Sequence, residues 1–490
     1  MRDRWTEQDR TLLAGRGIDP REAERQLELL HRPPPAARLA RAATVGDGIV
    51  RLDPAHDRER LEEGRRVIAA GRLTRLVPAS GAATRMFADL IAELDAPAGP
   101  SAAVERLARA LPDLPFDRWV AGAAERAGVD PDAARADPGA ARALVGSLLR
   151  GAPGADGLAS LPKGLLPFHR RGERALTPTE EHLEETVAVA GADARLHLTV
   201  AREHEPRFAA TIAATGVTVA IGFSHQSPAT DTLCLDERGE PLRDEEGRLV
   251  LRPGGHGALI GNLERCPGDV LAIRNIDNVL PAHARADRLL WTRRLVGELA
   301  LLESRVHAAL AALLHDADPQ PALTLARELG VEARDSAELA AALDRPLRVC
   351  AMVENLGEPG GGPFWVATPT RGVTLQIVEA SQVDAADPGQ AAIAAGATHF
   401  NPTDLVCSLR RWDGSRFALD AFVDPAASFV AEKSHRGRRI RALERPGLWN
   451  GAMAGWLSRF VEVPAGTFAP VKTVWDLLRP EHQPPAGVRR

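Results

Sequence analysis

The chain has 490 residues, of which 44% are apolar, and it carries a formal net charge of −5 with a pI near 6.3. This length can bury a large core, and it predicts two to three domains or one domain enlarged by insertions. The acidic balance argues against nucleic acid or an anionic membrane as the main partner. We therefore expect a globular protein that is long enough to be an enzyme.

The cysteines and the N-terminal sequence indicate a compartment. The four cysteines lack the spacing of a metal site, which predicts buried thiols in a reducing compartment. The N-terminal sequence MRDRWTEQDRTLL is charged from the start, and no apolar run reaches the length of a signal peptide or a membrane span. These features predict a cytoplasmic protein that does not bind a membrane. They indicate no oligomeric state.

Lysine is almost absent from the chain. Among 61 basic residues only Lys163, Lys433 and Lys472 are lysines. A compact ammonium group differs chemically from a planar guanidinium, so these lysines mark positions where arginine does not serve. Asparagine is also scarce, and its six positions all fall between residues 262 and 450. Chance is the alternative explanation for both patterns.

The order of helical and strand patterns predicts an α/β fold. Residues 1–70 are predicted to form an N-terminal helical cap, residues 71–410 an α/β domain, and residues 411–490 a C-terminal segment. Apolar runs of strand length at 73–77, 194–201, 217–224 and 269–276 alternate with helical patterns, which is typical of a mostly parallel sheet flanked by helices. The alanine-rich stretches at about 97–157 and 284–345 predict two large helical insertions.

Two loops carry features of an anion site. The segment PASGAATR, residues 78–85, follows the first strand and places small residues where a helix begins. Backbone N–H groups and the helix dipole can receive a phosphate there, and Arg85 adds positive charge. Lys163 lies between Pro162 and Gly164, in a stiff loop that suits an anion contact. The alternatives are a tight turn with a surface arginine and a plain surface loop.

A glycine-rich turn and an acidic strand end follow one another. The turn RPGGHG, residues 252–257, has three glycines around His256, so its backbone can approach a ligand closely. The strand at 269–276 then leads to Asp277, which Asn275 and Asn278 flank. The carboxyl end of such a strand is where open α/β sheets bind their ligands. An aspartate there is otherwise a turn or a helix cap.

Further candidates come later in the chain. The loop GEPGGGPF, residues 357–364, holds Glu358 and can line a cleft or serve as a connector. Glu379 lies within or just after a strand, and Asn401 and Asp404 precede another apolar strand. Lys472 follows a proline and precedes a helix.

Taken together, these motifs resemble those of the sugar-nucleotide pyrophosphorylases, in particular the UDP-sugar pyrophosphorylase branch of the GT-A-like nucleotidyltransferases. The resemblance covers about 400 residues in the same order. It rests on PASGAATRM, LPKGLLP, Gln226 followed by RPGGHG, and RNIDN, and more loosely on VEAS, FNPTD and FAPVKT. The whole chain also resembles a related bacterial family of unknown function, which shares GEPGGGPFWV and PGLWNGAMA.

The resemblance implies a GT-A/Rossmann-like fold and a nucleotidyltransferase that couples a nucleoside triphosphate, with UTP favoured, to a sugar 1-phosphate and releases pyrophosphate. It implies Arg85, Lys163 and Lys472 as catalytic cations and Mg²⁺ on Asp277 with Asp404. The implied nucleotide contacts are Ala79, Ser80, Gly81, Ala82, Gln226, Gly255 and His256, and the implied sugar contacts are Glu358, Glu379 and Asn401, the last an alternative metal ligand.

Two departures from the family pattern leave other functions open. Ala83 stands where the family has glycine, which narrows the approach of a phosphate, and a helical insertion separates Arg85 from Lys163. A glycosyltransferase of the related fold would use a strand-end aspartate with a metal, but it has no need for the Thr-Arg and Pro-Lys-Gly pair. A non-catalytic nucleotide-sugar binder would keep the base contacts and lose the phosphate-neutralising cations.

Overall fold

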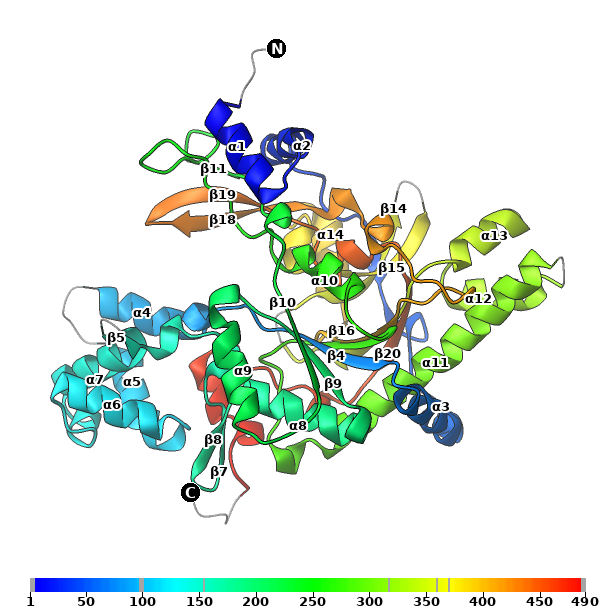
Figure 1. The fold of residues 1–490 in the computed structure, drawn as a ribbon. Coiled ribbons are helices and arrows are strands. Elements are labelled where there is room, and N and C mark those ends of the chain that lie inside the picture. The colour runs from blue at the N-terminus through cyan, green and yellow to red at the C-terminus, as the bar shows by residue number, and fades with distance from the viewer. Residues whose placement is uncertain are drawn as a thin grey trace. The chain divides into compact units, whose positions relative to one another are not determined.

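The computed structural model describes residues 5–96, 101–152, 155–315, 318–357, 360–368 and 371–485. By its internal contacts the chain divides into two compact units. Unit 1 comprises Met1–Leu76, Ser224–Ile273 and Thr292–Ala465, and unit 2 comprises Val77–Phe223, Arg274–Trp291 and Gly466–Arg490. The domain scheme predicted from the sequence is a separate division, and it stays a prediction. Figure 1 shows the elements by label.

Unit 1 is built on a large, mainly parallel sheet. Its strands follow the order β4-β12-β17-β13-β20-β3-β2, and β16 pairs with β13. The pairs β4–β12, β13–β20, β20–β3 and β2–β3 are parallel, whereas β13 is antiparallel to β17 and β16. The strands are β2 Thr44–Val45, β3 Gly48–Val50, β4 Leu73–Pro78, β12 Val270–Arg274, β13 Leu347–Glu354, β16 His399–Phe400, β17 Asp404–Ser408 and β20 Leu457–Glu462. Continuous burial along β12 is typical of a strand covered on both faces.

Two smaller antiparallel sheets complete the strands of unit 1. One has the order β1-β14-β15, and the other has the order β11-β19-β18. Their strands are β1 Leu39–Ala42, β11 Cys234–Leu235, β14 Gly362–Thr368, β15 Gly372–Val378, β18 Phe429–His435 and β19 Arg438–Glu444. Gly362, Pro363 and Phe364 of the predicted GEPGGGPF loop therefore belong to strand β14, where Pro363 pairs with Ile377.

The helices of unit 1 include the predicted N-terminal pair and the second helical insertion. They are α1 Glu7–Arg16, α2 Pro20–His31, α3 Asp57–Ala69, α10 Ile260–Glu264, α11 Ala286–Leu314, α12 Gln320–Glu328, α13 Ser336–Leu343 and α14 Pro388–Ala395. The first residues of α11, up to Trp291, belong to unit 2. Thr6 opens α1 with a capping box to Asp9, which satisfies backbone donors at the helix start. Figure 1 shows α3 crossing α11. Glycines make this crossing close, because a Cβ on Gly297 would lie 1.8 Å from the carbonyl oxygen of Arg60.

Unit 2 combines a helical cluster with strands β9 and β10. Helices α4 Ala88–Asp95, α5 Ala102–Ala110, α6 Asp117–Ala127 and α7 Pro138–Arg150 gather around fully buried Phe87, Phe116 and Leu148, as the first helical insertion predicts. The other elements are β5 Gly151–Ala152, β6 Ala155–Asp156, β7 His169–Arg171, β8 Arg174–Leu176, α8 Pro178–Ala190, β9 Arg195–Thr199, α9 Glu205–Ala213 and β10 Ala220–Ser224.

The structure confirms the predicted strands and the buried state of the cysteines. The expected strands correspond to β4, β9, β10 and β12, each with ends within a few residues of the prediction. All four cysteines are free and buried: Cys234, Cys266, Cys350 and Cys407. Burial raises the pKa of the Cys266 thiol to about 12, so this thiol is unreactive at neutral pH. Among the described helices, none combines the length and the apolar character needed to cross a bilayer.

The close crossing of α3 and α11 yields a stability prediction. Gly297→Ala should lower the free energy of unfolding by about 2 kcal/mol, because the added methyl group forces the two backbones apart. The better helix propensity of alanine, worth about 1 kcal/mol, opposes this loss without cancelling it. Gly15→Ala in α1 is the matched control, since a Cβ there meets nothing within 4 Å. A urea midpoint for Gly297→Ala equal to that of Gly15→Ala would contradict the close crossing.

Candidate functional site

In unit 2 the two predicted phosphate-binding loops pair with one another. The N–H of Ala83 donates to the carbonyl of Leu161 at 2.9 Å, and the N–H of Lys163 donates to the carbonyl of Gly81 at 3.2 Å. Ala82 and Pro162 form the intervening antiparallel bridge. The structure thus joins the small-residue loop after β4 to the Pro-Lys-Gly loop. The two ends of the helical insertion that separates these loops in the sequence therefore lie close together.

The local fold of both loops explains their small residues. Ala83 is fully buried against Met86 and Phe87, so its methyl group belongs to the hydrophobic core of unit 2. Alanine in place of the family's glycine therefore fills core space. Gly164 packs tightly, because a Cβ there would lie 2.7 Å from the ring of Phe208. The hydroxyl of Thr179 on α8 donates to the Gly164 carbonyl and fixes the loop from the other side.

Two of the three lysines of the chain meet on one carboxylate. Nζ of Lys163 donates to Oδ2 of Asp277 at 2.9 Å and to the carbonyl of Val471 at 2.9 Å. Nζ of Lys472 lies 3.3 Å from Oδ2 of Asp277 and 3.4 Å from Oδ1. Asp277 follows the end of β12, as predicted. Three residues that are far apart in the sequence thus form one ionic cluster.

The ionic cluster carries a net positive charge. Burial by itself would raise the pKa of Asp277, but the ammonium groups of Lys472 and Lys163 hold this pKa below its usual 3.8. Burial lowers the pKa of Lys163 from its usual 10.5, and Asp277 offsets part of that effect. Arg85, exposed in the 3₁₀ turn Ala83–Phe87, also lowers the pKa of Lys163 and so lies near enough to add its charge. An ionised Asp277 with two lysines leaves a net positive site that suits an anion.

The segment that carries Lys472 has its own local order. The backbone N–H groups of Lys472 and Thr473 both donate to Oδ2 of Asp476, in the capping box that opens the 3₁₀ turn Val474–Leu478. The N–H of Val471 donates to the carbonyl of Asp277 at 2.9 Å. Lys472 is half exposed, whereas the side chains of Lys163 and Asp277 are about nine-tenths buried. Lys472 is therefore the cation with the most freedom to follow a ligand.

In unit 1 the glycine turn RPGGHG packs against the segment at 444–449. A Cβ on Gly257 would lie 1.9 Å from the carbonyl oxygen of Pro446. Gly255 has φ +78°, and a Cβ there would lie 2.0 Å from Oε2 of Glu444, the partner of Lys433. The glycines thus permit close approach by the protein's own chain. Nucleotide contacts by Gly255 and His256 stay predictions.

His256 has a defined orientation and tautomer. The N–H of Leu448 donates to its Nδ1 at 3.0 Å, and Trp449 stacks on the imidazole with ring centroids 4.2 Å apart. Because Nδ1 accepts this bond, the ring hydrogen of the neutral imidazole lies on Nε2. The motif PGLWNGAMA, which sequence analysis identified only as a feature shared with the related family of unknown function, therefore has a structural role. It holds the glycine turn.

Gln226 is the predicted base contact with the clearest local signal. Among the described residues, its Nε2 is buried without a hydrogen-bond partner. Such an orphaned donor is costly unless a ligand or water satisfies it. Asn262, on the helix after the glycine turn, donates to Oγ of Ser224 and the carbonyl of His225. Asn262 thereby fixes the chain that leads to Gln226. It was missed in the sequence, although the scarcity of asparagine pointed to it.

The predicted sugar contacts and the second metal ligand lie in unit 1 or outside the described residues. Glu379 follows β15, and its side chain accepts from the backbone of Gln382. The amide of Asn401 donates to the carbonyl of Ala351 and accepts from the N–H of Thr403, so it holds a backbone turn. Asp404 begins β17. Glu358 lies outside the described residues. The ligand roles of these four residues stay predictions.

A magnesium ion fits only part of this donor set. Where the structure describes the chain, no three His, Cys, Asp or Glu side chains gather in a way that could hold a metal ion. In nucleotide enzymes Mg²⁺ is usually held by one or two carboxylates together with substrate phosphates and water. Asp277 supplies one such carboxylate, whose charge the lysines keep ionised. The ion therefore fits Asp277 if phosphate oxygens complete its shell.

The model of a family described as a domain of unknown function, DUF4301, matches residues 6–483. The chain belongs to the DUF4301 family. No curated protein matches this family member in sequence.

Solved structures resemble this DUF4301 chain in fold. The uridine diphosphate N-acetylglucosamine pyrophosphorylase from Trypanosoma brucei is 14% identical with a TM-score of 0.50, over 97% of this chain and 80% of that one. A UDP-glucose phosphorylase from Trypanosoma brucei is 13% identical with a TM-score of 0.46, over 96% and 77% of the two chains. At this identity the first likeness establishes a shared α/β fold.

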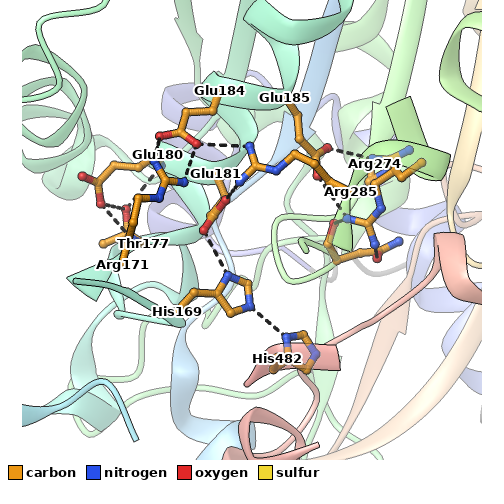
Figure 2. A network of polar contacts seen from close by, with 12 residues as sticks. His169, Arg171, Thr177, Glu180, Glu181, Glu184, Glu185, Arg274, Arg285 and His482 are labelled. Carbon is orange, nitrogen blue, oxygen red and sulfur yellow. Dashed lines mark hydrogen bonds and ion pairs between the residues drawn. The ribbon is translucent and has the colours of Figure 1, made fainter. Parts of the chain in front are cut away.

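Unit 2 also contains a buried pair of histidines (Figure 2). Nδ1 of His169 lies 3.1 Å from Oε1 of Glu181, and its Nε2 lies 2.9 Å from Nδ1 of His482. Burial lowers the pKa of both imidazoles to about 3, so both are neutral near pH 7. Burial raises the pKa of Glu181 to about 7. The pair ties the C-terminal segment to β7.

The histidine pair predicts a loss of stability in acid. The native imidazoles have a pKa of about 3 against the usual 6.5, so their contribution is complete above pH 6.5 and is lost as the pH falls toward 3. Each histidine contributes a slope of about 1.4 kcal/mol per pH unit in that window. Glu181 acts in the opposite sense, because its raised pKa favours the native state as the pH falls from 7. His482→Gln should flatten the stability profile measured by urea unfolding between pH 6.5 and 4.5.

The control for this prediction is His56→Gln, which alters a side chain that is 64% exposed. It should keep the wild-type profile. If His482→Gln folds and retains the wild-type slope, then the neutral histidine pair is not the source of acid sensitivity.

Proposed function

We propose that the protein is a Mg²⁺-dependent nucleotidyltransferase of the cytoplasm that couples a nucleoside triphosphate, with UTP favoured, to a sugar 1-phosphate and releases pyrophosphate. The observation that carries this proposal is the convergence of Lys163 and Lys472 on Asp277, beside the small-residue loop and Arg85. The shared fold with a solved pyrophosphorylase is compatible with it.

The reaction needs charge neutralisation and alignment more than covalent chemistry. Lys163 and Arg85 would hold the β- and γ-phosphates, which leave as pyrophosphate. Lys472 would hold the sugar phosphate, whose oxygen attacks the α-phosphorus in line with the leaving group. No protein nucleophile is required, because the sugar phosphate is itself the attacking group. Because Lys472 is half exposed, it suits the substrate that must enter last or move most.

Asp277 would hold the magnesium ion together with phosphate oxygens of the nucleotide. Mg²⁺ supplies Lewis-acid stabilisation of negative charge on those oxygens. In the structure both carboxylate oxygens of Asp277 face ammonium groups, so Asp277 also orients the two lysines. Asp404, or Asn401 in its place, is the proposed second ligand.

Nucleotide recognition is assigned to the loop residues that the sequence resemblance implies. The backbone at Ala79, Ser80, Gly81 and Ala82 would contact phosphate. The orphaned Nε2 of Gln226 favours a role in base recognition, since a carbonyl oxygen of the base would satisfy it. His256 and Gly255 would contribute at the base, and Glu358, Glu379 and Asn401 at the sugar.

The three cations distinguish this proposal from its rivals. A glycosyltransferase handles a diphosphate leaving group and needs no Pro-Lys-Gly contact with a triphosphate. A nucleotide-sugar binder would not need to bury an ammonium group such as Lys163 beside an ionised carboxylate, since burying charge is costly. The convergence of Lys163 and Lys472 on Asp277, with the charge of Arg85 acting on Lys163, favours nucleotidyl transfer.

Pyrophosphate release tests the proposal directly. Purified protein with Mg²⁺ should release pyrophosphate only when a nucleoside triphosphate and a sugar 1-phosphate are both present, and the panel of pairs identifies base and sugar. Lys163→Met and Lys472→Met should each lower kcat by about a hundredfold or more, because each removes one preorganised cation from the transition state. Asp277→Asn should remove the dependence on Mg²⁺ together with most of the activity.

The matched control is Arg334→Gln, which changes an 88% exposed cation on the surface of unit 1 and should leave kcat unchanged. Pyrophosphate release at the wild-type rate by Lys163→Met would overturn the assigned site. Absence of release across the panel, with nucleotide-sugar binding by calorimetry, would favour the binder. Release of nucleoside diphosphate from a nucleotide sugar would favour the glycosyltransferase.

A further inference from the structure

Helix α8 buries several ionisable side chains in unit 2. Glu181, His182 and Glu185 on this helix are fully buried, and Glu180 is 7% exposed. Figure 2 shows the glutamates of α8 facing arginines from other segments. Buried ion pairs add little net stability, because desolvation offsets the attraction between the charges. Their retention here calls for a role in fixing geometry.

Glu185 binds two buried arginines. Oε2 accepts from Nη1 of Arg274 at 2.9 Å, and Oε1 accepts from Nη1 of Arg288 at 3.2 Å. Arg274 is the last residue of β12, just before the loop that holds Asp277. Arg288 lies in the first turn of α11 and is fully buried. The carboxylate of Glu185 thus orients both arginines.

Arg288 joins the two segments that carry the ionic cluster. Its Nη1 donates to the carbonyl of Asn278 at 3.0 Å and its Nη2 to Oδ1 of Asn278 at 2.8 Å. Its Nε donates to the carbonyl of Thr467 at 2.8 Å. A planar guanidinium can serve these acceptors at once, whereas an ammonium group cannot hold that fork geometry. One side chain therefore links the residue after Asp277 to the segment that leads to Lys472.

Asn278 completes the connection. Its Oδ1 also accepts from the N–H of Ala469 at 3.2 Å, and Asn278 forms an antiparallel bridge with Pro470. The next bond in this ladder runs from the N–H of Val471 to the carbonyl of Asp277. The carbonyl of Val471 in turn accepts from Nζ of Lys163. The bond network thus runs without a break from Glu185 to the lysine cluster.

We propose that Arg288, oriented by Glu185, is a positioning residue that holds Asp277 and Lys472 at the separation required for nucleotidyl transfer. The claim that this separation serves nucleotidyl transfer rests on the proposed function. The claim that Arg288 fixes the separation does not. Arg288 is not among the residues assigned to either proposed substrate. It acts through Asn278 and Thr467 on the two segments that supply the cluster.

The rarity of lysine provides a test that needs no enzymatic activity. The chain has three lysines, so partial acetylation with acetic anhydride and mass spectrometry report each of them separately. In the wild type Lys163 should react slowly, because its side chain is 11% exposed and bound to Asp277 and Val471. Lys433, in unit 1 and 36% exposed, serves as the internal reference.

Arg288→Lys is the decisive variant, because it keeps the charge opposite Glu185 and loses the fork. Acetylation of Lys163 relative to Lys433 should rise severalfold, since Val471 and Asp277 no longer hold their places. If the wild type transfers nucleotides, kcat should fall about tenfold or more with little change in the KM for nucleotide, as small misplacements of reacting groups have large effects on rate. Asn278→Ala keeps Arg288 and removes the Oδ1 atom that accepts from both Arg288 and Ala469, and it replaces Arg288→Lys if that variant does not fold.

Arg171→Lys is the matched control. Arg171 pairs with Glu184 on α8 at the partly exposed end of the same network and forms no hydrogen bond or ion pair with residues 274–278. It should leave both acetylation and kcat unchanged. Circular dichroism and the urea midpoint confirm that each variant is folded before its lysines are compared.

The outcomes separate this inference from the proposed function. Faster Lys163 acetylation in Arg288→Lys, with a wild type that shows no nucleotidyl transfer, would support the geometric role and refute the function. An active wild type with unchanged acetylation and unchanged kcat in the variant would overturn the inference and leave the function intact. A lower kcat with unchanged acetylation would also overturn it, because Arg288 would then act by another route.

Discussion

The candidate site depends on the ion pairs that the carboxylate of Asp277 makes with Lys163 and Lys472. A buried ammonium group such as that of Lys163 is stable only beside a counter-charge, and Asp277 supplies it while also holding Lys472. The same pairing keeps Asp277 ionised despite its burial. The result is a compact positive site with one acceptor for a cation, which is the electrostatic character that a triphosphate and its metal require. Three loops of unit 2 have to meet for this to arise.

The buried residues that support Asp277 include more charged side chains than a stable protein core requires. Glutamates of α8 and arginines from β12 and α11 form a buried network that ends at Asn278, the neighbour of Asp277. An apolar core of similar volume would have provided comparable stability, whereas hydrogen bonds specify direction and distance. Charge in the interior of unit 2 is therefore best understood as a means of fixing the geometry of the site.

In unit 1, too, a predicted ligand-binding loop is held in place by residues from another segment. The glycines of RPGGHG face Glu444 and Pro446, and Trp449 and Leu448 orient His256. The motif PGLWNGAMA thus supports the turn that sequence resemblance assigns to the nucleotide. The third lysine, Lys433, pairs with Glu444 beside the same turn. Lysine scarcity in this chain therefore coincides with both predicted loop sites.

Local sequence determined the secondary structure and the candidate loops. Apolar runs of strand length predicted β4, β9, β10 and β12. In β12 the reason is clear, because a strand that is buried on both faces of a sheet requires a continuous hydrophobic stretch. Short motifs and the rarity of lysine identified Lys163, Lys472 and Asp277 as chemically distinctive residues. Only the tertiary structure decided that these three share one contact, since the contact depends on how distant segments pack. The same reason hid the buried glutamates of α8 and the role of Arg288: the sequence PTEEHLEETVAVA is typical of a solvated helix, and its burial is set by arginines elsewhere in the chain.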